Sequence, residues 1–204
     1  MAYYDYDRAE MLGYVPPDVG SVLDVGCAAG RFGAGLRARF PDAVLWGIDP
    51  TDPPDDGWDA YDERFTGRYP DDLPMREFDC IVFNDVLEHM TDPWAALQAT
   101  RLRVAGEGSV VASIPNVRHR HVVHQLVLRG RWDYADRGVL DRTHVRFFTR
   151  SSMLGLFADA GYRVERIEPL AVEATGRMGT LNRWFGGRLE EFLTLQYALV
   201  ARPC

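Results

Sequence analysis

Short apolar runs alternate with longer amphipathic segments along most of this chain. The runs are rich in Val, Ile, Leu and Phe, and short runs of this kind are typical of buried strands. Strands are predicted at residues 21–26, 44–48, 78–83, 109–114, 162–167 and 195–201, with a weaker one at 64–67. Amphipathic spacing predicts helices over residues 30–40, 93–105 and 149–160. Strands separated by helix-length segments predict a Rossmann-like α/β fold, a mainly parallel sheet with helices on both faces.

Individual residues predict where two of these helices begin and end. Asp92 caps free backbone amides and Pro93 fits the first helical position, so the second helix is expected to start there. Gly106 is the residue expected to end it. Thr149 caps the third helix in the same way, and Gly161 is expected to stop it.

Two glycines lie inside the first predicted helix. Gly33 and Gly35 each weaken a helix by about 1 kcal/mol relative to Ala, because glycine loses more backbone entropy on folding. Their presence in an otherwise regular amphipathic segment indicates that something packs closely against the backbone. We therefore expect close neighbours at both positions.

Length and composition indicate one globular domain, residues 1–204. The chain is 47% hydrophobic, which excludes a disordered polar protein, and no apolar run approaches the ~20 residues that cross a bilayer. The first residues lack the basic and hydrophobic pattern of a secretory signal. Three cysteines, Cys27, Cys80 and Cys204, form no CxxC pair, which argues against a disulfide framework or a zinc site. We expect a cytoplasmic protein with no membrane partner.

The charge is acidic but unevenly spread. A formal net charge of −7 argues against a general nucleic-acid binder, which needs a basic face. Residues 42–85 hold thirteen acidic side chains and three Arg, whereas residues 117–150 hold eight Arg, three Asp and four His. The second region is the candidate for contact with an anion. A solvated basic face is the alternative for His119, His121 and His124.

The first strand runs into a glycine-rich turn. Gly26 and Gly30 allow close approach of the backbone to a ligand, but the spacing differs from the GxGxxG of dinucleotide-binding proteins. Asp49 closes the second strand, next to the first, where an acid accepts hydrogen bonds from a ribose diol. A tight turn without a ligand is the alternative for the loop, and a turn that starts at Asp49 before Pro50 is the alternative for the acid.

These residues resemble a class I S-adenosylmethionine-dependent methyltransferase. The similar segments are residues 22–30, the family's cofactor loop with Ala28 in place of a third Gly, and residues 78–93, its fourth strand and following helix. Residues 114–116 and 141–149 are similar to a bacterial subfamily associated with sugar, glycan or natural-product methylation. The resemblance implies a seven-stranded, mostly parallel sheet with an antiparallel last strand, and a small-molecule substrate.

The resemblance also implies a set of residues that bind S-adenosylmethionine. Backbone and side chains around the glycine loop line its methionine part, the acid after the second strand binds its ribose, and residues after the fourth strand flank its amino group. This set is Tyr4, Arg8, Asp24, Gly26, Cys27, Ala28, Gly30, Asp49, Pro50, Asn84 and Asp85. A solvated N-terminal helix is the alternative for Tyr4 and Arg8.

Two histidines are candidates for the base that oxygen methylation needs, because imidazole titrates near neutral pH. His144 is the first choice and His89 the second. The alternative for His144 is a hydrogen bond to a backbone carbonyl that shapes its loop. Asp85, Glu88 and His89 are spaced to share a helical face, as in ubiquinone-pathway O-methyltransferases whose triplet holds a divalent ion. Hydrogen-bonded residues at a helix start are favoured over such a metal site.

The basic region suggests how an acceptor is bound. Residues 116–148 are interpreted as an insertion that forms a substrate lid, with Arg131, Tyr134 and Arg142 as substrate-binding residues. Because Arg binds carboxylate or phosphate through two hydrogen bonds, the acceptor is expected to be anionic. Oxygen methylation is favoured over nitrogen methylation. The alternatives are a nicotinamide-dependent oxidoreductase on a related fold and a non-catalytic cofactor-binding subunit.

Overall fold

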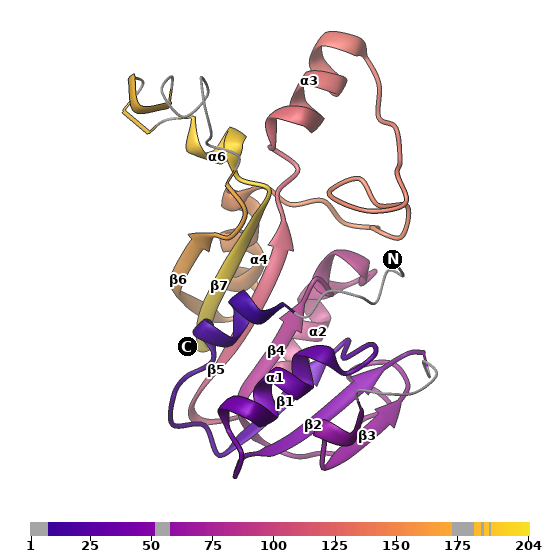
Figure 1. Ribbon diagram of the computed structural model, residues 1–204, viewed down its shortest axis with the longest axis vertical. Helices are drawn as coiled ribbons and strands as arrows, with labels where there is room; N and C mark the ends of the chain where they lie inside the picture. The colour runs from indigo at the N-terminus through magenta and orange to yellow at the C-terminus, as the bar shows by residue number, and fades with distance from the viewer. Residues whose placement is uncertain (1–7, 52–57, 173–181, 185, 188) are drawn as a thin grey trace.

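A computed structural model describes residues 8–51, 58–172, 182–184, 186–187 and 189–204. Seven strands form one sheet with the order β3-β2-β1-β4-β5-β7-β6. In chain order they are β1 (Ser21–Val25), β2 (Val44–Asp49), β3 (Glu63–Thr66), β4 (Phe78–Asn84), β5 (Val104–Pro115), β6 (Tyr162–Pro169) and β7 (Gln196–Pro203). Strands β1 to β5 pair in parallel, while β7 runs antiparallel to both β5 and β6. The expected seven-stranded Rossmann-like sheet with an antiparallel last strand is confirmed (Figure 1).

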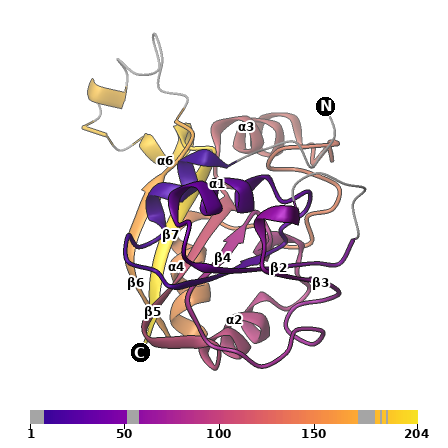
Figure 2. The same cartoon turned by 60° about the horizontal axis from the view of Figure 1, so that its bottom comes forward.

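Helices cover both faces of this sheet. The helical segments of the described residues are the 3₁₀ segments η1 (Ala9–Tyr14), η2 (Trp58–Ala60) and η3 (Leu87–His89), and the α-helices α1 (Arg31–Arg39), α2 (Pro93–Arg101), α3 (Arg120–Arg129), α4 (Arg150–Asp159) and α6 (Glu190–Leu193). Figure 2 shows α1 on one side of the sheet and α2 with α4 on the other. Because successive strand residues face opposite sides, Phe83 packs in the core under α2 and α4, and Val82 in the core under α1 and η1.

The predicted caps hold at two helix starts. The Asp92 carboxylate accepts a hydrogen bond from the Ala95 amide at 3.0 Å, with Pro93 as the first helical residue. Thr149 and Ser152 form a reciprocal capping box at the start of α4. These local signals identified both starts because capping depends on residues that are close in sequence.

The predicted end of α2 at Gly106 is wrong. The helix ends at Arg101, and Gly106 lies inside β5 with a φ of +35°. The chain turns earlier because Arg103 is buried and its guanidinium donates to three backbone carbonyls, those of Pro70, Leu73 and Pro74. These hydrogen bonds hold Arg103 outside the helix. Strand β5 therefore begins at Val104, five residues before the predicted strand at residues 109–114.

The glycines inside α1 have the close neighbours that the sequence predicted. A Cβ built on Gly33 would lie 2.3 Å from the ring of Tyr61, and one on Gly35 would lie 2.9 Å from Leu12. Helix α1 thus packs against η1 and η2 on one face of the sheet. Cys27, at the start of the glycine loop, belongs to the same hydrophobic core.

Candidate active site

The glycine loop, residues 26–30, joins β1 to α1. Gly26, Ala28 and Gly30 have φ values of +76°, +44° and +75°, all in the left-handed region that favours glycine. Ala28 adopts the conformation that a third glycine would adopt freely, at a cost of roughly 1–2 kcal/mol. Ala28 thus has a left-handed backbone at the position where the resembling family has its third glycine.

Asp49 holds this loop from the end of β2. Its Oδ2 accepts a hydrogen bond from the Ala28 amide at 2.9 Å, and its Oδ1 accepts from the amide and hydroxyl of Thr51 at 2.8 and 2.6 Å. The turn that was the alternative interpretation of Asp49 is thus observed, and Pro50 within it is exposed. Since two carboxylate oxygens accept about four hydrogen bonds, Asp49 can still accept one from a ligand beside the loop.

Asp24 is a buried acid beneath the same loop. It is 2% exposed, and the Tyr61 hydroxyl donates to its Oδ2 at 2.5 Å. Burial raises the pKa of Asp24 to about 7, and the nearby charge of Asp49 also raises it, while the bond from Tyr61 acts in the opposite direction. Burial likewise raises the pKa of the Cys27 thiol, so that Cys27 is neutral.

The raised pKa of Asp24 predicts a pH-dependent stability for the ligand-free protein. The folded-state pKa of about 7 lies above the ordinary value of 3.8, so ionisation of Asp24 opposes folding. Its contribution is complete below about pH 4 and is lost as the pH rises through about 7, a change on the order of 2–4 kcal/mol. In urea unfolding, Asp24→Asn should flatten this dependence between pH 5 and 8.

A matched variant controls for this measurement. Asp18 is exposed, so Asp18→Asn should keep the wild-type slope of unfolding free energy against pH. An Asp24→Asn protein with the same slope as wild type would show that Asp24 ionises as freely in the folded chain as in the unfolded one.

Two residues follow β4, and they have different surroundings. Both polar atoms of the Asn84 side chain are shielded from solvent, and they have no hydrogen-bond partner within the described residues. Asp85 is instead engaged: it accepts hydrogen bonds from Ser113 and Gln196 and forms an ion pair with Arg8. Arg8 also donates to Gln196 at 3.3 Å. Tyr4 lies outside the described residues.

The short turn η3 carries Glu88 and His89 toward the segment that contains His144. The backbone carbonyl of Glu88 accepts from the amides of Val145 and Arg146 at 2.9 and 3.0 Å. The rings of His89 and His144 meet edge to face with centroids 4.7 Å apart. These contacts join two segments that are more than fifty residues apart in the sequence.

Each of these histidines has one ring nitrogen at a backbone carbonyl. Nδ1 of His144 lies 3.0 Å from the Val139 carbonyl oxygen, and Nδ1 of His89 lies 3.2 Å from that of Thr143. A carbonyl oxygen only accepts, so both Nδ1 atoms carry the proton and each neutral ring has its lone pair on Nε2. The carbonyl-bonded interpretation of His144 is thus observed. Burial lowers the pKa of both histidines, and both rings are held in their neutral form.

The triplet Asp85, Glu88 and His89, which the spacing suggested as a possible metal set, is not the cluster that forms. Asp85 has a φ of +53°, which excludes it from η3, and its carboxylate faces Arg8. His144 takes its place: ligand atoms of Glu88, His89 and His144 all lie within 4.8 Å of one another. The sequence spacing missed this set because it depends on a long-range contact.

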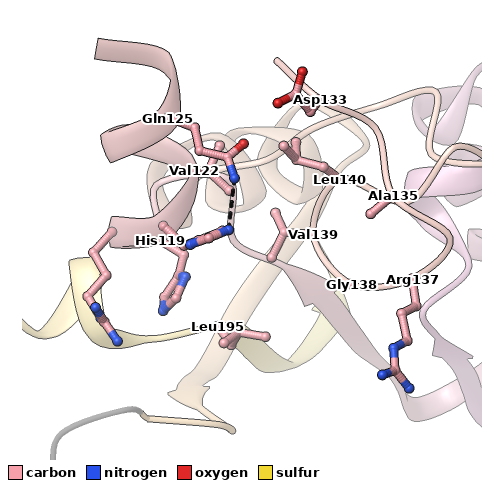
Figure 3. Close-up of a pocket in the computed structure, with 12 residues that line it drawn as sticks. His119, Val122, Gln125, Asp133, Ala135, Arg137, Gly138, Val139, Leu140 and Leu195 are labelled. Carbon is pink, nitrogen blue, oxygen red and sulfur yellow. Dashed lines mark hydrogen bonds between the residues drawn. The ribbon is translucent and has the colours of Figure 1, made fainter. Parts of the chain in front are cut away.

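The predicted lid segment, residues 116–148, contains α3 and the loop after it, and Figure 1 shows both beyond the end of the sheet where β4 and β5 finish. A cavity of about 370 Å³ lies between α3 and residues 133–140. Figure 3 shows its side chains, among them Gln125, Arg137 and Leu140; Arg120 and His121 also line it. Its wall includes Val139, the residue whose carbonyl binds His144.

The predicted substrate-binding residues lie on the same segment but outside the lining of this cavity. Arg131 pairs with Asp133, and Arg142 pairs with Asp136, at 2.8 and 2.9 Å. Tyr134 is half exposed, with its ring 6.3 Å from that of Phe147. The charge pattern of the sequence identified the basic segment, but Arg120 and Arg137 line the cavity, whereas Arg131 and Arg142 form ion pairs on the loop. Within the described residues, no helix has the length and hydropathy of a membrane span.

Comparison with known proteins identifies the family. Residues 3–167 match a family model described as a methyltransferase domain. A demethylmenaquinone methyltransferase from Roseiflexus sp. (strain RS-1) is 34% identical over 128 residues, which are 60% of this chain and 52% of that protein. The chain thus spans about half the length of this curated relative.

Solved structures share the fold. A SAM-dependent methyltransferase from Archaeoglobus fulgidus has a TM-score of 0.67 at 17% identity, covering 95% of this chain and 91% of that one. An O-methyltransferase from neocarzinostatin biosynthesis, solved with S-adenosyl-L-homocysteine and 1,4-dihydroxy-2-naphthoic acid, has a TM-score of 0.59 at 17% identity, covering 98% of this chain and 51% of that one. The family match leaves no support for the nicotinamide-dependent oxidoreductase. This chain belongs to the methyltransferase-domain family.

Proposed function

We propose that the protein transfers a methyl group from S-adenosylmethionine to a hydroxyl of a small, negatively charged acceptor such as a sugar or a natural product. The observation that carries this proposal is the arrangement of the glycine loop, Asp49 and Asn84 at the carboxyl ends of the adjacent strands β1, β2 and β4. Ligands of open α/β sheets bind at this edge. The side-chain amide of Asn84, which is shielded from solvent and has no hydrogen-bond partner among the residues that the structure describes, fits a polar ligand there.

The residues present match the parts of S-adenosylmethionine. Asp49 would accept a hydrogen bond from a ribose hydroxyl, and the loop backbone would line the methionine part. Asn84 would bind the amino group, together with Asp24 and Asp85. Arg8 would pair with the carboxylate, which requires it to exchange its ion pair with Asp85 for one with the ligand.

The cofactor supplies a methyl group that is already activated by the positive sulfur. Transfer forms an oxygen–carbon bond and breaks the carbon–sulfur bond, whose electron pair stays on sulfur, and the hydroxyl proton leaves to a base. Alignment of the reacting atoms by the protein supplies roughly 7–11 kcal/mol of the barrier reduction in such reactions. The tasks left to this chain are therefore to position the acceptor and to take its proton.

We assign His144 and His89 as the residues that accept the hydroxyl proton. Both have their lone pair on Nε2, because Nδ1 donates to a backbone carbonyl. His144 is only 7% exposed, whereas His89 is partly exposed. In the metal-free protein His89 is therefore the base that contacts the acceptor hydroxyl, and the His144 ring lies next to it.

The acceptor would lie between this pair and the cavity of the lid. Arg120 and Arg137 line that cavity, and Arg131, Tyr134 and Arg142 lie on the same segment. Five basic or hydrogen-bonding side chains on one lid favour a carboxylate or phosphate on the acceptor. Product formation with matched pairs of acceptors tests this: hydroxy acids should yield S-adenosylhomocysteine, their methyl esters far less. Turnover of only the uncharged members would contradict an anionic acceptor.

The arginines of the lid give a second prediction. Arg120→Ala with Arg137→Ala should raise KM for the anionic acceptor at least about tenfold with little change in kcat, since each charge-assisted hydrogen bond is worth ~1.5–3 kcal/mol. Arg131→Ala with Arg142→Ala should raise KM less, because neither side chain lines the cavity. Steady-state kinetics at saturating cofactor measures both. An unchanged KM in both double variants would remove the lid from acceptor binding.

A further inference from the structure

Glu88 is a buried acid whose surroundings do not satisfy it. The residue is 1% exposed, and neither carboxylate oxygen has a hydrogen-bond partner within the described residues. Nε2 of His144 lies 4.0 Å from its Oε1, which is too long for a hydrogen bond. A buried carboxylate without partners is costly unless a cation or a proton neutralises it.

The two histidines beside Glu88 are held as metal ligands are held. In metal sites the second ring nitrogen of a ligating histidine donates to a carbonyl or carboxylate, which fixes the ring and directs the other nitrogen to the ion. Val139 and Thr143 provide those carbonyls here. Both accepting carbonyls belong to residues 139–146. This segment is held against η3 because the amides of Val145 and Arg146 donate to the Glu88 carbonyl. The two rings are therefore oriented before any ion arrives.

The charges nearby also favour a divalent cation. Asp141 is 3% exposed, and its Oδ1 accepts hydrogen bonds from the amide and the hydroxyl of Thr143 at 2.8 and 2.6 Å. Its second oxygen, Oδ2, is buried with no partner in the described part of the chain. Asp141 and Glu88 are thus two buried acids near His89 and His144, and a divalent cation bound there would neutralise them.

We propose that Glu88, His89 and His144 bind one divalent transition-metal ion through a carboxylate oxygen and two imidazole Nε2 atoms. Their ligand atoms lie within 4.8 Å of one another, close enough to surround a common ion. Two imidazoles with one carboxylate suit ions such as Mn²⁺, Fe²⁺, Co²⁺ or Zn²⁺, whereas Mg²⁺ and Ca²⁺ prefer oxygen ligands. Three protein ligands leave positions open for an acceptor oxygen.

The site deepens the proposed function, on which its role in methyl transfer rests. An acceptor oxygen bound to the ion loses its proton more readily, because the metal lowers its pKa. In the metal-bound protein the hydroxyl proton would pass to water, because the ion would occupy the Nε2 atom of His89. Binding of the ion itself depends only on the three side chains.

Cobalt titration of the untagged full chain, first freed of metal with a chelator, tests the site. Co²⁺ should produce a visible ligand-field absorption that saturates at one equivalent, and Zn²⁺ should abolish the signal whereas a large excess of Mg²⁺ should not. Glu88→Gln keeps the size of the side chain and removes a buried charge, so it should fold. It should weaken Co²⁺ binding at least about 100-fold, and His144→Asn should do the same.

Controls separate this site from others. His121 and His124 lie on α3 outside the cluster, and His121→Ala with His124→Ala should bind Co²⁺ as wild type does. No ligand-field band in the wild-type protein, or equal Co²⁺ affinity in Glu88→Gln and wild type, would overturn the proposal. S-adenosylhomocysteine calorimetry on the same metal-free samples distinguishes the two proposals: heat without cobalt binding removes only the metal site, and cobalt binding without heat removes only the proposed function.

Discussion

Gly26→Ala is expected to raise the dissociation constant for S-adenosylhomocysteine at least about 100-fold. A Cβ at position 26 would lie 2.5 Å from Cγ2 of Val86, and the φ of +76° is one that alanine adopts at a cost of roughly 1–2 kcal/mol. The loop must shift to relieve this contact. Its backbone amides and the Asp49 carboxylate would then no longer face the ligand together. A loss of about 2.7 kcal/mol corresponds to the 100-fold change.

Gly155→Ala is the matched control for this variant. Gly155 lies within α4, and a Cβ there would have nothing within 4 Å. The change should leave ligand affinity unaltered and stabilise the helix by about 1 kcal/mol. Isothermal titration calorimetry measures both affinities, and thermal unfolding checks both folds. Wild-type affinity in a folded Gly26→Ala protein would show that the ligand does not approach the loop backbone.

Asp49→Ala is also expected to weaken cofactor binding, for a different reason. Asp49 can accept one hydrogen bond from the ribose, and such a bond to a carboxylate contributes about 1.5–3 kcal/mol, which predicts a loss of roughly 10- to 100-fold. Asp49 also orients the loop through the Ala28 amide, so a loss of affinity alone would not show which role matters. The measurement therefore needs a second ligand.

The 2′-deoxy analogue of S-adenosylhomocysteine separates the two roles. If Asp49 binds the ribose, wild type should prefer the natural ligand over the analogue at least tenfold, and Asp49→Ala should bind both equally. If Asp49 only holds the loop, the variant should weaken both ligands by the same factor and keep the wild-type preference. A preserved preference would thus contradict the ribose assignment.

The fold could be predicted from the sequence because its determinants are local. Apolar runs identified the strands, and Asp92 and Thr149 identified two helix starts through hydrogen bonds that span a few residues. The end of α2 could not be predicted, since it depends on Arg103 reaching carbonyls about thirty residues away. Gly106 has a positive φ within a strand, which a glycine signal alone cannot distinguish from a helix end.

The candidate site likewise contains parts that could be predicted from the sequence and parts that could not. The glycine loop and Asp49 lie at the ends of two neighbouring strands, so a parallel sheet brings them together as predicted. The contact of His144 with Glu88 and His89 could not be predicted, because it depends on how residues 139–146 return to η3. Helical spacing suggested Asp85 instead, and the left-handed backbone at that residue removes it from the cluster.

Calorimetry of the wild-type chain with two adenosine-containing ligands tests the central claim most directly. A loop that presents its amides beside Asp49 and Asn84 should bind S-adenosylhomocysteine at one site per chain, with no measurable heat from NADH at the same concentration. Heat from NADH together with none from S-adenosylhomocysteine would contradict the account.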